Sequence, residues 1–219
     1  EANVTWNDKK GDFQYMVNLN YSTNKNTLLS WSETLPKGSM FIDMPYNFVY
    51  AFESIGIAQT WEDVYKATPQ GAAPGDILIK DVNGDGKIDA NDRVAYPEYQ
   101  LGRPGSNYAL RGSASWKGFD IAVLLQGAFG RKEFWMNRIN SPFLGTTNQA
   151  VTYEQLNQTW NLDNRGAEYP RLLPSTLGST STNNYLSTFW LQDLSYLRLK
   201  NVQLGYTFRN NIIKKVGFG

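Results

Sequence analysis

The sequence predicts an all-β fold of antiparallel strands, and three observations lead to it. Aromatic residues are abundant, with 7 Trp, 13 Tyr and 11 Phe among 219 residues, and they alternate with polar residues in several segments. The tight connections between these segments contain Gly. No stretch approaches the roughly 18 consecutive apolar residues of a membrane-spanning helix, which excludes a helical membrane protein.

Composition excludes several kinds of chemistry. The chain has no Cys and no His, so disulfides, thiolate nucleophiles, Cys/His zinc sites and a Ser-His-Asp triad are excluded. The 21 basic and 20 acidic residues balance and do not cluster, so we expect no nucleic-acid partner. The chain opens at Glu1 without a signal peptide, so we expect a removed leader or an internal piece of a longer protein.

The first predicted hairpin lies at the start of the chain. Between residues 13 and 21, apolar and aromatic side chains take every second position, and only Met16 interrupts the polar face. A shorter run over 2–6 shows the same alternation, and the connector 8–11 ends in Gly. We therefore expect two antiparallel strands joined by this turn.

A second hairpin and a final strand are predicted further along. Residues 110–116 alternate before a tight Lys117-Gly118 turn, and the return strand runs over 119–125. The last run, 197–208, changes phase once near Asn201, which indicates a β-bulge. Weaker strand candidates are 26–31, 40–52 and 76–80.

Two long polar stretches, 56–104 and 130–189, are each far longer than an ordinary connection. Short turns at one end and long loops at the other are typical of outer-membrane barrels. If the Lys117-Gly118 turn is periplasmic, the alternation of strand direction places both stretches outside. The same alternation makes the first turn, 8–11, periplasmic only if 26–31 is a strand. The alternative is a soluble sandwich or surface β-domain, in which the apolar faces pack on a second sheet.

One segment, 81–92, has the spacing of a twelve-residue calcium loop. Side-chain oxygens occupy loop positions one, three, five, nine and twelve, and position seven offers a backbone carbonyl. The candidate metal ligands are Asp81, Asn83, Asp85, Lys87, Asp89 and Asp92. Gly86 supplies the sharp turn at position six, and Ile88 is placed to anchor the loop.

Hard oxygen ligands in this number suit a structural Ca²⁺. Asp92 stands where Glu is usual at position twelve, and its shorter side chain would weaken calcium affinity or admit Mg²⁺. The alternative is an Asp/Asn/Gly-rich turn that binds nothing. Pro74-Gly75 and Pro97 argue against flanking helices, so we expect the ion to tie down a long loop without taking part in catalysis.

The sequence gives little support for catalysis, and we do not expect an enzyme. Glu53, Glu62 and Asp63 could form an acid/base pair in principle, but no pattern brings two of them together. Aromatic residues of the second long stretch could stack on sugars, fill a partner's pockets or form a small core of their own. These residues are Trp135, Phe143, Tyr153 and Trp160.

Four groups of segments occur in a distinctive order. They are Pro74-Gly75-Asp76-Ile77 leading into the 81–92 loop and Asp92-Arg93; Trp116-Lys117-Gly118-Phe119-Asp120 with Gln126-Gly127 and Gly130; Tyr169-Pro170-Arg171; and 193–201 with Leu204-Gly205-Tyr206. With these segments, from about Trp6 to its end, the chain resembles the C-terminal part of the barrel of SusC/RagA-type TonB-dependent outer-membrane transporters of Bacteroidetes.

The resemblance implies a plugged barrel of the 22-stranded type in the Gram-negative outer membrane, to which residues 1–219 contribute. It also implies import of glycan or peptide fragments with a SusD-like surface lipoprotein as a lid, energised by TonB through an N-terminal box. Further partners are then outer-membrane lipid, the rest of the barrel, the plug, and an oligosaccharide or peptide substrate. Because about seven strands cannot close such a barrel, we expect the chain to be part of a longer protein.

In this interpretation the apolar strand faces contact lipid, and Trp6, Trp116 and Phe119 lie in the interfacial girdle. The residues expected to face the plug or lumen are Arg111, Ser113, Asp120 and Gln126. Two other functions stay open. One is a secreted or surface calcium-stabilised β-domain that binds carbohydrate without transport, and the less supported one is a glycosidase that uses Glu53, Glu62 or Asp63.

Overall fold

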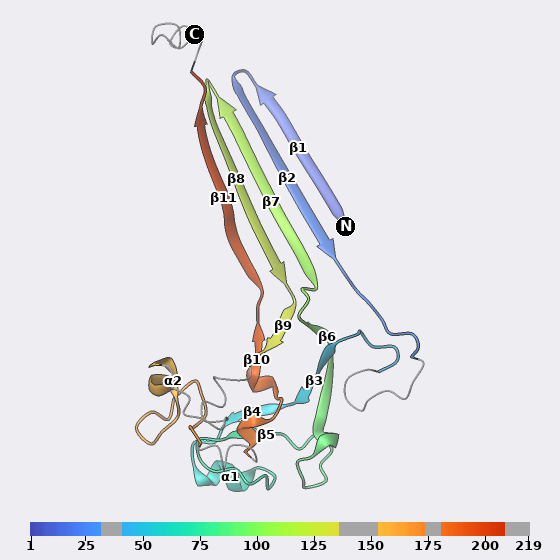
Figure 1. The fold of residues 1–219 in the computed structure, drawn as a ribbon, viewed down its shortest axis with the longest axis vertical. Helices are drawn as coiled ribbons and strands as arrows, with labels where there is room; N and C mark the ends of the chain where they lie inside the picture. The colour runs from blue at the N-terminus through green and yellow to red at the C-terminus, as the bar shows by residue number, and fades with distance from the viewer. Residues whose placement is uncertain (32–40, 136–152, 174–180, 209–219) are drawn as a thin grey trace, which may run out of the picture. The chain divides into compact units, whose positions relative to one another are not determined.

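The structure is a computed structural model that describes residues 1–31, 41–135, 153–173 and 181–208, without the side chains of 154 and 155. Two compact units are present, one formed by Glu1–Thr27, Gly102–Arg131 and Leu194–Gly219, the other by Leu28–Leu101 and Lys132–Asp193. Strands pair antiparallel in both units and the helices are short, which confirms the predicted all-β class (Figure 1). In the described part of the chain, no helix is long and apolar enough to cross a membrane.

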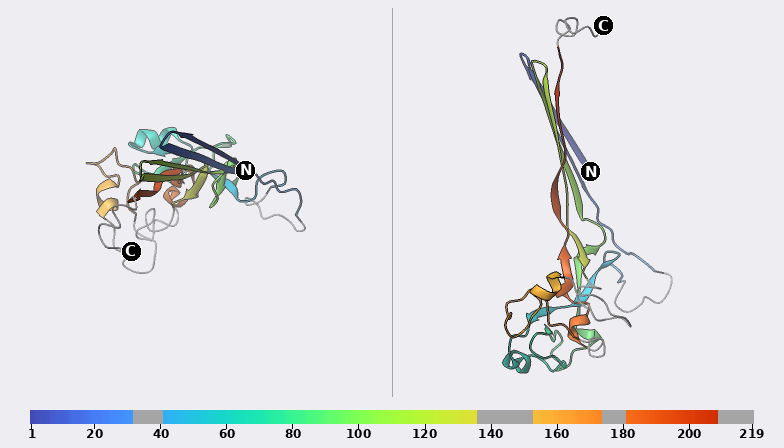
Figure 2. Two further views of the ribbon diagram at one scale, coloured as in Figure 1. Left: turned by 90° about the horizontal axis from the view of Figure 1, so that it is seen from above. Right: turned by 60° about the vertical axis from the view of Figure 1, so that its left-hand side comes forward.

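The first unit is a five-stranded antiparallel sheet with the order β1-β2-β7-β8-β11. Its strands are β1 (Ala2–Lys10), β2 (Phe13–Thr23), β7 (Ser106–Trp116), β8 (Phe119–Phe129) and β11 (Tyr196–Tyr206). Figure 2 shows these strands from two further directions as a single layer. The five main strand predictions are therefore confirmed, with ends that differ by a few residues.

Two tight turns close the hairpins at the same end of this sheet. Both residues of the Lys117-Gly118 turn have positive φ, 48° and 94°, as the mirror-image turns favoured in hairpins require. The first turn is tighter than predicted, because β1 continues to Lys10, which pairs with Phe13. Gly11, with φ of 62°, begins this two-residue turn. Backbone pairing with β2 thus keeps 8–10 in the strand although their polar side chains interrupt the alternation.

The weaker strand candidates before residue 53 do not join this sheet. Residues 26–31 form no strand, so that prediction is wrong, and Leu28 instead exchanges backbone hydrogen bonds with Asp43 and Met44. Candidate 40–52 reduces to β3 (Phe48–Phe52) of the second unit. The chain therefore lies outside this sheet from the end of β2 to the start of β7. Both long excursions start at the end of the sheet opposite the two turns, and no strand at 26–31 is needed to place them there.

The register gives the sheet one apolar face and one polar face. Trp6, Val17, Gly112, Val123 and Val202 align across the five strands and share the apolar face. Large side chains on this face are exposed, among them Val4, Trp6, Phe119, Ile121 and Leu204. Within this unit, the described residues supply no second layer to cover them. The buried apolar face that a sandwich requires is therefore absent from the sheet itself.

Aromatic residues border the apolar face at both ends. At the turn end, a cross-strand row consists of Phe13, Trp116, Phe119 and Tyr206. At the other end, Tyr21 and Tyr108 lie with Phe129 at ring-centroid distances of 6.3 and 6.0 Å. The eight-residue step from Phe13 to Tyr21 spans about 27 Å along a strand, or about 21 Å at a barrel tilt near 40°.

Trp6 was expected near a strand end, but in the structure it lies four residues before the end of β1. Its indole N–H donates to the Tyr15 hydroxyl at 3.2 Å. Asp8 and Lys10 follow Trp6 on the same face, opposite Tyr15 and Phe13. On β1, Trp6 is therefore the aromatic residue where the apolar part of the face ends.

The predicted bulge in β11 is confirmed. Its pairing with β8 shifts register between Leu199 and Asn201. Leu197 and Leu199 lie on the apolar face before the shift, and Val202 and Leu204 lie on it afterwards. The extra residue thus keeps the face apolar while odd and even positions exchange sides.

The second unit contains short elements around a small core. A sheet of order β10-β9-β6-β3 includes β6 (Arg93–Leu101), β9 (Arg131–Phe134) and β10 (Leu191–Asp193), and β4 (Ser54–Ile57) pairs with β5 (Ile77–Ile79), which confirms the 76–80 candidate. The helical elements are α1 (Trp61–Lys66), α2 (Tyr153–Gln158), η1 (Ala90–Asp92), η2 (Thr182–Asn184) and η3 (Thr188–Trp190). The buried core consists of Phe52, Ile77, Ile79 and Trp190.

Two glycines on the apolar face of the five-stranded sheet differ in the space around them. A Cβ at Gly127 would lie 2.2 Å from the Tyr108 ring and 2.5 Å from the Tyr196 carbonyl oxygen, whereas a Cβ at Gly112 meets nothing within 4 Å. The Tyr108 hydroxyl also donates to that carbonyl. We expect Gly127→Ala to destabilise the sheet by about 1–3 kcal/mol, because the carbonyl belongs to the paired backbone of β11 and cannot move aside.

The measurement is the thermal midpoint of the native polypeptide that contains this chain, with Gly112→Ala as the matched control. The control should leave the midpoint unchanged or nearly so. Equal midpoints for the two variants would contradict the close approach of β7 and β11 across Gly127.

Candidate functional site

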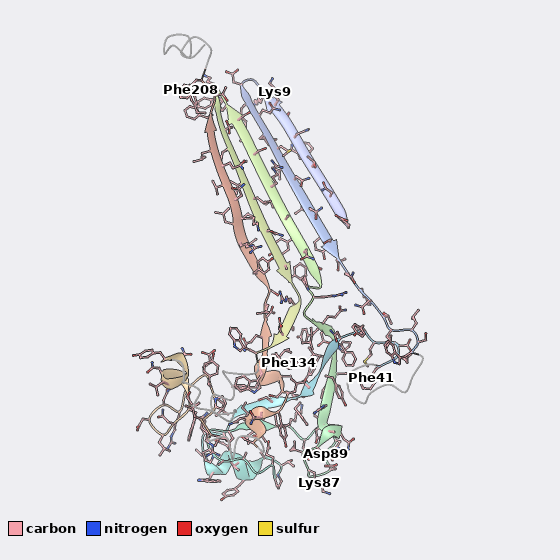
Figure 3. All side chains as sticks on the ribbon, viewed as in Figure 1. Lys9, Phe41, Lys87, Asp89, Phe134 and Phe208 are labelled. Atoms are coloured by element: carbon pink, nitrogen blue, oxygen red, sulfur yellow. The ribbon has the colours of Figure 1, made fainter. Side chains whose placement is uncertain are left out.

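The candidate metal loop connects β5 to β6 in the second unit and is anchored at three points. It begins two residues after the end of the buried β5, and Ile88 packs against the core as predicted. Its last residue, Asp92, is 0% exposed. The residues between are exposed, and Figure 3 shows Lys87 and Asp89 near the tip of the loop.

Asp81 at position one organises the first half of the loop. Its two carboxylate oxygens accept the backbone N–H groups of Gly84 at 2.7 Å and Gly86 at 2.9 Å. The second oxygen also accepts the Thr68 hydroxyl at 3.2 Å. Gly84 and Gly86 have φ of 71° and 81°, a backbone region that favours glycine. The sharp turn predicted at position six is therefore present.

Positions three and five form the next turns of the loop. The Asn83 side-chain oxygen accepts the N–H of Asp85, and Asp85 accepts the N–H of Lys87, both at 2.9 Å. The Asn83 amide donates to the second oxygen of Asp85 at 3.1 Å. These contacts direct the two side chains along the loop rather than away from it.

Positions nine and twelve close the loop through η1. Asp89 accepts the Asn91 N–H at 2.7 Å, and Asp92 accepts the N–H groups of Asp89 at 2.8 Å and Val82 at 2.9 Å. Burial disfavours the charged form of Asp92, but the backbone N–H groups of Asp89, Val82 and Asn83 outweigh it and lower the pKa of Asp92. A charged carboxylate therefore stands at position twelve at neutral pH.

The chemistry of the donor set suits a hard cation. Five side chains with oxygen donors and the Lys87 carbonyl share one short loop whose glycines have the required conformation. Across the described residues, however, no three or more acidic side chains are grouped closely enough to hold an ion. Most of these oxygens accept N–H groups of the loop itself, so ion binding stays a prediction.

An ion pair with a buried carboxylate lies directly before β5. Asp76 is 2% exposed and accepts two hydrogen bonds from Arg171, from Nε at 2.7 Å and from Nη2 at 2.8 Å. The amide of Asn183 donates to the same carboxylate at 3.0 Å. The hydrogen bond to Asp76 raises the pKa of Arg171, against the effect of burial. The segments 74–77 and 169–171, which both contribute to the family resemblance, are therefore in direct contact.

Gly75 and Trp160 complete this anchor. Gly75 has φ of 92°, and a Cβ there would lie 2.4 Å from the Trp160 ring and 2.9 Å from the Arg171 Cβ. The Gly75 N–H donates to Ala58 at 2.7 Å, and the Arg171 N–H donates to Gly75 at 2.8 Å. The Trp160 indole N–H donates to the Gln59 side chain at 3.0 Å. These contacts fix where β5, and hence the metal loop, begins.

Each of the three candidate acid/base residues forms an ion pair or hydrogen bonds with a neighbouring residue. Glu53 forms an ion pair with Lys80 at 2.8 Å, Glu62 pairs with Lys66 at 2.7 Å, and Asp63 forms a capping box with Thr60 at the start of α1. The Thr60 backbone and side chain, followed by the Gln59 backbone, lower the pKa of Asp63. These contacts account for the carboxylates without catalysis.

The aromatic residues of the second long stretch have different environments. Trp160 is 7% exposed and packs on Gly75 of the first long stretch, whereas Trp135 and Tyr153 are exposed, and Phe143 lies outside the described residues. Sequence reasoning missed an exposed pair on α1, Trp61 and Tyr65, whose rings stack at 5.9 Å. Their i,i+4 spacing after the Thr60 cap was the available signal.

The sheet of the first unit has the features of a membrane β-barrel wall. It combines antiparallel strands, an exposed apolar face bordered by aromatic rows, a polar opposite face, short turns at one end and long excursions at the other. Such an arrangement is stable where lipid covers the apolar face.

Comparisons with known proteins agree with this class. No family model matches the chain. TonB-dependent receptor P3 of Formosa agariphila is 28% identical over 94% of this chain, and TonB-dependent receptor SusC of Bacteroides thetaiotaomicron is 21% identical over 95%. A solved structure of the RagAB peptide transporter superposes with a TM-score of 0.64 at 20% identity, over 96% of this chain.

The chain spans about a fifth of the length of these relatives, 21% of P3 and 18% of SusC, and 23% of the RagAB chain. The comparisons confirm the resemblance to SusC/RagA-type TonB-dependent receptors, the barrel fold and the outer membrane as the location. The relatives are receptors and transporters rather than enzymes.

The ion pair between Asp76 and Arg171 gives a test of the loop anchor. Arg171→Ala keeps the Cβ that packs on Gly75 but leaves the Asp76 carboxylate without its cation. We expect a local loss of about 2–4 kcal/mol, which is seen as a fall of about thirtyfold or more in hydrogen-exchange protection over 73–79. The Ile77 N–H, which donates to Asn183 at 2.8 Å, is the reporter.

Glu62→Gln is the matched control, because it breaks an ion pair whose side chains are 73% and 70% exposed. Exposed pairs contribute at most about 1 kcal/mol, so protection over 73–79 should not change. An Arg171→Ala protein with unchanged protection would contradict the anchoring role of the pair.

Proposed function

We propose that this chain forms part of the wall and extracellular loops of an outer-membrane TonB-dependent active transporter of the 22-stranded type. The transporter imports glycan or peptide nutrients together with a SusD-like surface lipoprotein, and TonB energises it through a region outside this chain. The exposed apolar face of the five-stranded sheet, with its two aromatic borders, carries the proposal.

Sequence position and topology support the rest of the assignment. The relatives include TonB-dependent receptor SusC, and the RagAB neighbour is described as a peptide transporter. β1 and β11 are the outer strands of the described sheet, so neighbouring strands of the same barrel would pair with their free edges. The polar face, with Arg111, Ser113, Asp120 and Gln126, would then face the plug and the passing substrate.

We also propose that the loop 81–92 binds Ca²⁺ as a structural ion, with Mg²⁺ as the competing ion because Asp92 is short. The ligands are Asp81, Asn83, Asp85, Asp89 and Asp92, with the Lys87 carbonyl. Neutralising four carboxylates in twelve residues would stabilise a loop that is exposed between its anchors. In an outward-facing loop this ion would hold the surface where a lipoprotein partner and substrate arrive.

The alternative is a secreted calcium-stabilised β-domain that binds carbohydrate without transport. The stacked, exposed Trp61 and Tyr65 are the observation in its favour, because flat aromatic surfaces stack on sugar rings. It does not explain the exposed apolar face of the sheet, so transport is the better assignment.

A charge placed on either face of β2 separates the two functions. Val17 lies on the apolar face in mid-strand, and Met16 lies on the polar face beside it. Val17→Lys should cost about 2–4 kcal/mol in a barrel wall and strongly reduce the folded, heat-modifiable protein in the outer membrane. Met16→Lys changes a side chain of similar length and should assemble normally.

Equal assembly of the Val17→Lys and Met16→Lys proteins would contradict a membrane-facing sheet. A protein that stays soluble without detergent would point to the secreted domain instead. Both readouts are made on the native polypeptide extracted from membranes.

The metal proposal predicts a calcium affinity that depends on Asp85. Asp85→Asn keeps the oxygen that accepts the Lys87 N–H but removes one charge from the donor set, so we expect calorimetric calcium affinity to fall about tenfold. Asp163→Asn, an identical change at an exposed Asp outside the loop, is the control. Absence of calcium binding by the unaltered protein, or equal affinities of the two variants, would overturn the metal site.

A further inference from the structure

The apolar face of the five-stranded sheet is hollowed near its turn end. The hollow has a volume of about 520 Å³, and its lining includes Ala114, Trp116, Phe119, Ile121, Leu204 and Tyr206. The strand register places the three rings in one cross-strand row and the three aliphatic side chains in the next row. Ala114 is the smallest of these side chains, so it leaves the space that the larger ones surround.

The hollow continues as a groove along β7 towards the middle of the sheet. The next position of β7 on the apolar face is Gly112, where a Cβ would meet nothing within 4 Å. Gly112 and Ala114 each lie between larger side chains of β2 and β8. From Gly112 to Trp116 this path, the β7 groove, is about 13 Å long. A narrow apolar path of this kind fits an extended hydrocarbon chain.

A cation lies at the turn end of the β7 groove. Lys117 follows Trp116 directly, and its ammonium group lies 5.2 Å from the centroid of the Trp116 ring. A lysine whose stem lies on apolar surface while its charge reaches the polar border is typical of membrane interfaces, as is a neighbouring Trp. The groove is therefore apolar along its length and positively charged where it ends.

Acidic residues of the described turn end do not cancel this charge. Asp120 lies on the polar face, because it pairs with Ser115 and Gly205 outside the aromatic row. In the first hairpin, two acidic residues accompany two lysines, over positions 8, 9, 10 and 12. Lys117 is therefore the net charge beside the groove.

The two parts of the groove match the two parts of a lipid. The small residues of β7 leave room for an acyl chain, whose burial against the flanking apolar side chains is favourable. Lys117 is placed to pair with a phosphate at the level of the head groups. An anionic head group suits this position best, because it brings no cation of its own to repel the lysine.

We propose that the β7 groove binds one anionic glycerophospholipid, with an acyl chain along Gly112 and Ala114 and the phosphate beside Lys117. The inference rests on the proposed function, because the groove must face the membrane. The short turns are then periplasmic, so the lipid belongs to the inner leaflet of the outer membrane. The site selects one kind of lipid, beyond the general contact of a barrel wall with the bilayer.

The test measures lipid affinity of the full-length protein in detergent by native mass spectrometry. The probes are phosphatidylglycerol, which is anionic, and phosphatidylcholine with the same acyl chains, which has no net charge. Ala114→Leu fills the groove, and Ala2→Leu makes the same change on the same face, opposite Tyr21 at the other end of the sheet.

A second pair of variants tests the charge. Lys117→Asn removes it and creates the Asn-Gly sequence that mirror-image hairpin turns favour, so the turn is kept. Lys9→Asn is the matched control. It removes the same charge at the same end of the sheet but on the polar face, opposite Gln14 (Figure 3).

We expect the tightest site of the unaltered protein to prefer phosphatidylglycerol over phosphatidylcholine by about fivefold or more. Lys117→Asn should remove this preference. Ala114→Leu should weaken the binding of both lipids by about tenfold, because the methylene groups that it displaces lose their apolar contacts. The two control variants should bind both lipids as the unaltered protein does.

Equal affinities of the unaltered protein for the two lipids, or unchanged affinities in Ala114→Leu, overturn the inference. A dimer that Ala114→Leu dissociates would identify a second copy of the protein as the occupant and overturn it as well. The heat-modifiable barrel band of the same samples reports on the proposed function separately. An intact barrel without the lipid preference therefore rejects only the lipid site.

Discussion

The second unit depends on the ion pair between Asp76 and Arg171. The pair removes a carboxylate from water, and it is stable because two hydrogen bonds from one guanidinium and one from Asn183 replace the lost hydration. It joins segments 95 residues apart, so it closes a long loop whose entropy cost must be offset by such contacts. Because β5 begins at the next residue, the pair also fixes the origin of the candidate metal loop.

The first unit depends on a different constraint, the two-residue period of its strands. A slip of one residue would move every apolar side chain to the polar face, so the register must be exact along all five strands. The tight turns at Gly11 and Lys117-Gly118 fix it at one end, and the bulge in the middle of β11 corrects a sequence that would otherwise run out of phase. The bulge is therefore required by the sequence of β11.

Sequence reasoning succeeded where the determining interaction is local and failed where it is not. The alternation of β2, the Lys117-Gly118 turn, the phase change near Asn201 and the sharp turn at Gly86 depend on residues a few positions apart. Residues 26–31 were misassigned because a short apolar run cannot show that the chain has left the sheet. The contact of Asp76 with Arg171 and the burial of Trp160 could not be predicted from spacing, because both are decided by partners far away in the chain.

The two faces of the sheet also differ in how charge is distributed. On the apolar face, the charged residues of the strands are Asp8 and Lys10, which lie beyond Trp6 at the turn end, so the band between the aromatic borders carries no charge. Arg111 lies at the same level as this band but on the other face, opposite Leu124. The same strands therefore keep charge out of the band that lipid would cover and place it on the polar face, where Arg111 is exposed.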